Sequence, residues 1–78
     1  MTTFEQLQSL IATTLKVPAK KISETTVNED IAAWDSLGQV NLMMALEQTF
    51  GVFLEPEELS SLASVPAIMQ YLREHGVT

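Results

Sequence analysis

The sequence contains no cysteine, a single histidine and few basic residues. Without cysteine the chain can form no disulfide, no thiolate metal site and no cysteine nucleophile, so its stability must come from packing alone. This composition fits a reducing compartment. The chain also lacks an apolar run long enough to cross a bilayer, and its first residues lack a basic stretch typical of targeting signals. We therefore predict a soluble, cytoplasmic protein without membrane insertion.

Positive charge is missing from most of the chain. The basic residues are Lys16, Lys20, Lys21 and Arg73, so residues 22–72 contain none, whereas ten acidic residues give a formal net charge of −6. An acidic surface repels phosphate backbones and anionic lipid, which argues against nucleic-acid binding. The same surface attracts partners with basic patches, although it also serves solubility alone.

The length of 78 residues limits the chain to one small domain, residues 1–78. We predict an all-α bundle, monomeric, with three main helices and one short helix. Helical periodicity covers residues 4–15, 36–50 and 65–75, and Pro56 begins the short helix. Leu59 and Leu62 are expected to give that short helix one buried side.

Local signals predict the ends and the connections of the helices. Thr3 and Gln6 have the spacing of a capping box, and Val17-Pro18 ends the first helix. Residues 16–35 show no helical or strand periodicity, so we expect a long crossing loop. A short helical turn at residues 31–33 is an alternative for part of it. Apolar residues are expected to pin this loop across the helix ends, namely Val17, Ile22, Val27, Ile31 and Trp34.

The second main helix has the clearest signals. Asp35 is a good N-cap, so Ser36 lies exposed in the first turn, and Gly51 is a natural C-cap. Gly38, also in the first turn, either costs local stability or gives a partner room near Ser36. Met43 is expected to fill the core together with Leu42, Ala45, Leu46 and Phe50, while Val40 and Met44 lie outside.

Catalysis and metal binding have weak support in the sequence. Asp35 and Ser36 are adjacent, so Asp35 cannot orient His75 between itself and the serine as a catalytic triad requires. His75 is better read as a partner of a helix C-terminus. The acidic residues lack the spacing of a calcium loop, and no helical histidine pair is present. We therefore assign no catalytic residue and no metal ligand.

A resemblance to a known family rests on Asp35-Ser36-Leu37 and the residues after it. This motif, followed by Val40, Leu42, residues 45–47 and Phe50-Gly51, resembles the acyl carrier protein family over nearly the whole chain. The resemblance implies that a phosphopantetheinyl transferase joins 4'-phosphopantetheine from coenzyme A to Ser36. The thiol of this arm would hold acyl groups as thioesters, so the resemblance implies a carrier and not an enzyme.

The resemblance also implies roles for other residues. Asp35 and Leu37 would be recognised by the transferase. Other positions match the family's surface for synthase enzymes with basic docking patches, namely Val40, Met44, Glu47, Glu55, Glu57 and Glu58. An apolar interior that opens around a bound acyl chain is matched by Leu46, Leu59, Leu62 and Met69, for which ordinary core packing is the alternative.

Departures from the family pattern concern the cargo. Glu47 is the only acid of the second helix, and Trp34 replaces a small residue. We therefore expect a specialised, polyketide-type or other non-primary pathway, or else a D-alanyl-type aminoacyl carrier, loaded by a dedicated ligase or transferase. The rival class is an unmodified helical interaction domain that binds partners through Val40, Met44 and the acidic surface.

Overall fold

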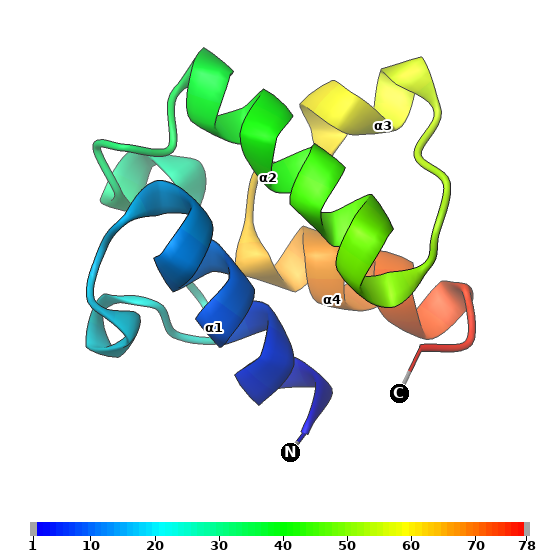
Figure 1. Cartoon of the computed structure of the whole chain (residues 1–78), viewed down its shortest axis with the longest axis horizontal. Helices are drawn as coiled ribbons and strands as arrows, with labels where there is room; N and C mark the ends of the chain where they lie inside the picture. Colours follow the sequence, from blue (N-terminus) through cyan, green and yellow to red (C-terminus); the bar gives the residue numbers. More distant parts are fainter. Residues whose placement is uncertain (1, 78) are drawn as a thin grey trace.

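The computed structural model of the chain describes residues 2–77, and it confirms the all-α prediction (Figure 1). The three main helices are α1 (Thr3–Leu15), α2 (Ser36–Phe50) and α4 (Val65–Glu74), and α3 (Pro56–Ser61) is the short one. Helix α2 lies between α1 and α3 and contacts both of them. Within residues 2–77, the only β pairing is an isolated bridge.

Helix α1 begins one residue earlier than predicted. The N-cap is Thr2 and not Thr3, because the Thr2 hydroxyl accepts from the Glu5 amide at 3.1 Å while the Glu5 carboxylate accepts from the Thr2 amide at 3.0 Å. A carboxylate accepts more strongly than the amide of Gln6, which favours the earlier box. The end at Leu15 agrees with the prediction, and Lys16 leaves the helix in a left-handed conformation.

The connection between α1 and α2 is more regular than predicted. It contains two short 3-10 turns, Ala19–Lys21 and Asn28–Asp30, and residues 31–34 form a turn closed by the Trp34 amide on the Ile31 carbonyl at 2.9 Å. The predicted pinning is confirmed for Ile22, Ile31 and Trp34, which are buried, whereas Val17 and Val27 are half-buried.

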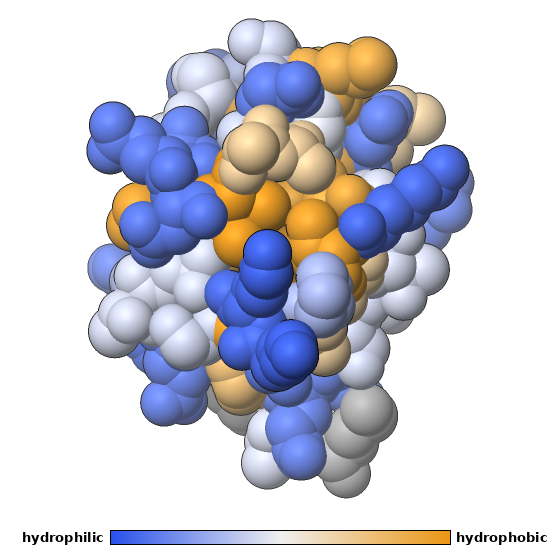
Figure 2. Space-filling view, turned by 90° about the vertical axis from the view of Figure 1, so that its left-hand side faces the viewer, coloured by the Kyte–Doolittle hydropathy of each residue, from blue (hydrophilic) through white to orange (hydrophobic). Residues whose placement is uncertain are grey.

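Polar contacts also hold this connection in place. The Gln8 side chain of α1 donates to the Ala19 and Ile22 carbonyls at 3.0 and 2.8 Å. An antiparallel bridge joins Val27 to Ser64, the N-cap of α4. On the side of the molecule where the connection lies, an apolar centre is surrounded by hydrophilic side chains (Figure 2). The hydrogen bonds and the bridge hold the connection against α1 and the start of α4, so it is not a free loop.

The core lies where α1, α2, α4 and the connection meet. Met43 is buried as predicted, as are Leu42 and Leu46 of α2, whereas Ala45 and Phe50 are half-buried. The predicted burial of Leu59 is wrong, because this side chain remains 37% exposed on α3. The other fully buried side chains of the core are Leu7, Ile11, Val65, Ile68 and Leu72.

Candidate functional site

The start of α2 presents Ser36 at the positive end of a helix. Asp35 precedes it as the N-cap, and its carboxylate accepts from the Gly38 amide at 2.9 Å. Ser36 is exposed, and helix N-termini carry free amides and a partial positive charge that favour an anion. The geometry therefore offers an accessible hydroxyl where a phosphate group is tolerated.

Gly38 allows the connection to lie directly on the first turn of α2. A Cβ built on this residue would stand 2.2 Å from the Ala33 carbonyl oxygen and 3.1 Å from the Leu15 side chain. Gly38 is itself buried, so the backbone of the connection fills the space beside it. Of the two readings of Gly38, room for a partner does not fit this arrangement, since residues of the chain itself occupy that room.

Gln39 joins three segments around the serine. Its side-chain oxygen accepts from the indole nitrogen of Trp34, and its side-chain nitrogen donates to the carbonyls of Leu59 and Leu62 at 2.7 and 3.0 Å. Gln39 lies one turn after Ser36, so both side chains are on the same side of α2. This amide therefore connects the loop before the serine to the end of α3.

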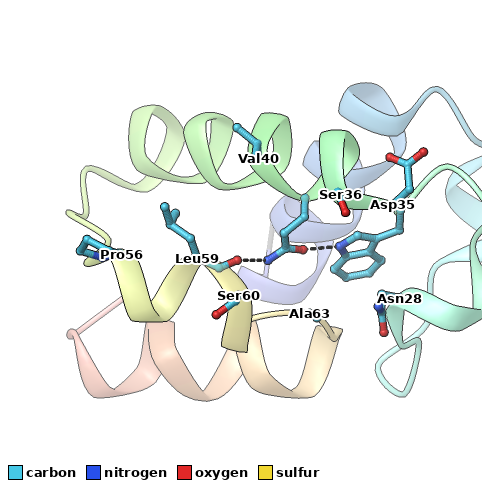
Figure 3. Close-up of a pocket in the computed structure, with 10 residues that line it drawn as sticks. Asn28, Asp35, Ser36, Val40, Pro56, Leu59, Ser60 and Ala63 are labelled. Carbon is cyan, nitrogen blue, oxygen red and sulfur yellow. Dashed lines mark hydrogen bonds between the residues drawn. The ribbon is translucent and has the colours of Figure 1, made fainter.

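An open groove of about 530 Å³ lies between α2 and α3, with Ser36 at one end (Figure 3). In Figure 3 the Asp35 carboxylate points away from the groove, while Leu59 of α3 faces the space below α2. The exposure of Leu59 is thus exposure to this groove. The lining combines apolar Trp34, Val40, Pro56, Leu59 and Ala63 with polar Asn28, Asp35, Ser36, Gln39 and Ser60.

The two apolar residues expected on the outer face of α2, Val40 and Met44, are 49% and 54% exposed. Leu37, one turn before Val40, is also exposed, at 70%. Large exposed apolar side chains that lie close together are typical of contact surfaces. Val40 also lines the groove, so the exposed stripe and the groove beside Ser36 share an edge.

The acidic residues after α2 divide into free and engaged ones. Glu55 and Glu57 are exposed, whereas the Glu58 carboxylate accepts from the Glu55 amide, at the N-cap of α3, at 2.9 Å. The Glu47 carboxylate accepts from the Leu54 amide at 2.9 Å and is half-buried. Glu47, Glu55 and Glu58 therefore also organise the turn into α3.

The pKa of Tyr71 is affected by the charge of three of these acids. Its hydroxyl donates to the Phe53 carbonyl at 2.9 Å. Burial raises the pKa of Tyr71 above its ordinary value, and the negative charges of Glu58, Glu47 and Glu55 raise it further. Negative charge is thus concentrated where α2, α3 and the turn between them meet.

The four acyl-pocket candidates do not surround one cavity. Leu46 and Leu62 are buried in the core, and Leu59 lies in the groove. Met69 is half-buried and lines a separate hollow of about 350 Å³ with Phe4 and Arg73. The structure therefore joins only Leu59 to the Ser36 region.

The single histidine is used away from the groove. The His75 ring lies on the Tyr71 ring with centroids 4.0 Å apart, and its Nδ1 is 2.9 Å from the Tyr71 carbonyl at the end of α4. This position agrees with the predicted role at a helix C-terminus.

Residues 2–77 contain no group of three acidic or histidine side chains that could hold a metal ion. No helix in the same range is long and apolar enough to span a membrane.

Sequence reasoning missed Gln39. The signal was present in Trp34, because a buried indole normally finds a partner for its N–H group. The identity of that partner depends on how α2, α3 and the connection pack. No local sequence pattern predicts this packing.

Comparisons with known proteins identify the proteins to which the chain is similar. A family model described as "Phosphopantetheine attachment site" matches residues 5–72. The chain is 36% identical to an acyl carrier protein of Helicobacter pylori over 76 residues, which cover 96% of each chain. It is 38% identical to an acyl carrier protein of Thermosynechococcus vestitus over 87% of this chain and 84% of that one. An acyl carrier protein of Clostridium acetobutylicum is 36% identical over 92% and 94% of the two chains.

Proposed function

The chain belongs to the acyl carrier protein family, whose members are carriers with covalently attached 4'-phosphopantetheine and not enzymes, and we propose that Ser36 is its attachment residue. One observation carries this proposal: Ser36 is the exposed first residue of α2, at the mouth of the groove. The arm would supply the thiol that this cysteine-free chain lacks.

The residues around Ser36 fit the group. The amides of the first turn and the helix dipole favour the phosphate, and Ser36 is exposed. Asp35 is engaged with the Gly38 amide, which fixes the first turn and so the direction of Ser36. The groove beside it has space for part of a flexible arm or its cargo.

The attachment chemistry follows from a serine and coenzyme A. The Ser36 oxygen forms a bond to the phosphorus next to the pantetheine, and the diphosphate linkage of coenzyme A breaks. Adenosine 3',5'-bisphosphate leaves, and the hydroxyl proton passes to a base of the transferase. The chain itself contributes a positioned hydroxyl and the field of a helix N-terminus.

We assign the neighbouring surface to partner enzymes. Asp35 and the exposed Leu37 flank Ser36 and would be read by the phosphopantetheinyl transferase. Synthase enzymes and the loading ligase or transferase would use the exposed apolar stripe together with the acidic turn. That surface comprises Val40, Met44, Glu47, Glu55, Glu57 and Glu58.

The test is intact mass after incubation with coenzyme A and a broad-specificity transferase. We expect the wild type to gain one phosphopantetheine group and Ser36→Ala to gain none. Ser60→Ala is the matched control, because Ser60 lines the same groove and should not change the gain. A wild type without a mass gain would favour the unmodified interaction domain.

We further propose a specialised, non-primary pathway, of polyketide type, with a D-alanyl-type aminoacyl carrier as the second candidate. The support is the acid-poor α2, in which Glu47 is the single acid. One carboxylate gives a basic patch of a general synthase little charge to bind on this helix. Efficient loading and elongation of the modified protein by a general fatty acid synthase would contradict this pathway.

A further inference from the structure

Helix α3 is fastened to α2 by polar side chains at both of its ends. At its carboxyl end, Gln39 donates to the Leu59 carbonyl, a bond drawn in Figure 3, and to the Leu62 carbonyl. At its amino end, Glu47 accepts from the Leu54 amide, just before the helix. We call this pair of contacts the α2–α3 clamp.

The clamp matters because α3 is short and contains no buried residue. The helix has six residues, and helices this short are not stable alone. Buried apolar residues anchor the chain on either side of it, Leu54 before the helix and Leu62 after its last turn. The Gln39 amide adds the polar contact that joins the end of α3 directly to α2.

Behind the clamp the interior is already filled. Leu46 is fully buried, and Leu62 and Trp34 are nearly so. The groove beside Ser36 is lined by neither Leu46 nor Leu62. An alkyl chain can pass from the open groove into the interior behind Gln39 only if α2 and α3 separate, which breaks the bonds of Gln39 to Leu59 and Leu62.

We propose that Gln39 is a specificity-determining residue that excludes long acyl chains from the helical interior. This inference rests on Ser36 being the attachment residue. Cargo attached there lies in the open groove, so the carrier accepts short or polar acyl groups and gives a long apolar chain no buried site. Trp34 supports the function by holding the oxygen of the Gln39 amide.

The test compares thioesters of two lengths on the same protein. A broad-specificity transferase loads acetyl- or tetradecanoyl-phosphopantetheine from the corresponding coenzyme A thioester, and mass spectrometry verifies each product. Hydroxylamine cleavage is then followed by intact mass. A chain enclosed by the protein shields its thioester, whereas a chain in the open groove does not.

We expect the wild type to lose both acyl groups at equal rates. In Gln39→Ala the tetradecanoyl thioester should be cleaved about tenfold more slowly than the acetyl one, a factor comparable to the net contribution of one or two hydrogen bonds. Gln48→Ala is the matched control, since Gln48 is an exposed glutamine of α2, and it should behave as the wild type.

Two results would overturn the proposal. One is protection of the tetradecanoyl thioester in the wild type, which needs no variant to interpret. The other is equal cleavage rates in a Gln39→Ala protein with wild-type helical content by circular dichroism. If that variant loses helix, Gln39→Met replaces it, because methionine keeps the side-chain length and lacks the amide. A missing mass gain at the loading step would instead contradict attachment at Ser36.

Discussion

At the scale of single residues, the first turn of α2 shows how much depends on one missing Cβ. Gly38 follows Ser36 by two residues and lies against the Ala33 carbonyl. The sequence alone leaves two readings of this glycine, because helix propensity describes the helix and not its neighbours. The contact across the turn excludes room for a partner and gives Gly38 a role that neither interpretation included, as a packing residue against which the connection lies.

We therefore expect Gly38→Ala to destabilise the protein, although alanine is the better helix former. The added Cβ would stand 2.2 Å from a backbone oxygen, so the connection must move. Overpacking of this kind costs about 1–3 kcal/mol in the free energy of unfolding. Urea denaturation followed by circular dichroism measures it, and Asn41→Ala, at an exposed site of α2, is the control. Equal or higher stability of Gly38→Ala would show that the connection moves aside without a cost in free energy.

At the scale of elements, the four helices were predictable and the contacts of the short one were not. Periodicity, caps and proline are local signals, so α2 and α4 agree with the sequence, and α1 differs only at its cap. The orientation of α3 follows from Gln39, a polar residue without a pattern of its own. For this reason burial was predicted correctly for Leu62 and wrongly for Leu59.

The site divides in the same way. Ser36 and its N-cap Asp35 are apparent from the sequence, because a capping residue before an apolar period is a local signal. The groove, by contrast, needs three segments to meet, and Gln39 is the residue that joins them. The lining of the groove therefore could not be predicted before the packing of these segments was known.

Glu47 provides the element-scale prediction. Its carboxylate accepts from the Leu54 amide in the turn between α2 and α3. Hydrogen bonds to charged groups contribute about 1.5–3 kcal/mol to the free energy of unfolding. We expect Glu47→Ala to lower the free energy of unfolding by an amount near the lower end of this range, since the site is half-buried, and to speed hydrogen exchange at Leu54. Glu47→Gln keeps an acceptor oxygen and should lose less.

Glu24→Ala serves as the control for Glu47, because it removes an exposed acid of the connection. The same loss of stability in Glu24→Ala would mean that net charge, and not the bond to Leu54, is responsible. Unchanged exchange at Leu54 in Glu47→Ala would contradict the assigned contact.

At the scale of the whole molecule, acidic side chains are concentrated at one end of the buried core, where α2, α3 and the turn between them meet. Tyr71 lies at the junction, with its ring in the core and its hydroxyl on the Phe53 carbonyl. Burial and then Glu58, Glu47 and Glu55 raise its pKa. The folded protein therefore holds the Tyr71 proton more tightly than the unfolded chain does.

The sign of the pH dependence follows from linkage. A group with a raised folded pKa stabilises fully below its unfolded pKa, and this contribution is lost as pH rises through the folded pKa. We expect the free energy of unfolding to fall above about pH 10, the ordinary tyrosine value. Urea titrations at several alkaline pH values measure the slope.

Tyr71→Phe tests whether the Tyr71 hydroxyl causes this effect. The variant should be less stable at neutral pH, because the bond to Phe53 is lost, and its stability should fall less steeply at alkaline pH. Equal slopes in the two proteins would exclude Tyr71 as the cause.

The bridge between Val27 and Ser64 also has a consequence for how the chain folds. The Asn28 amide bonds to the Ala63 carbonyl at 2.9 Å and the Val65 amide to the Thr26 carbonyl at 2.8 Å, so α2 and α3 form a loop closed at its base. Closing a long loop costs entropy that local helix formation does not. The bridge should therefore form after α2, and the rate of folding should be limited by this closure and not by the helices.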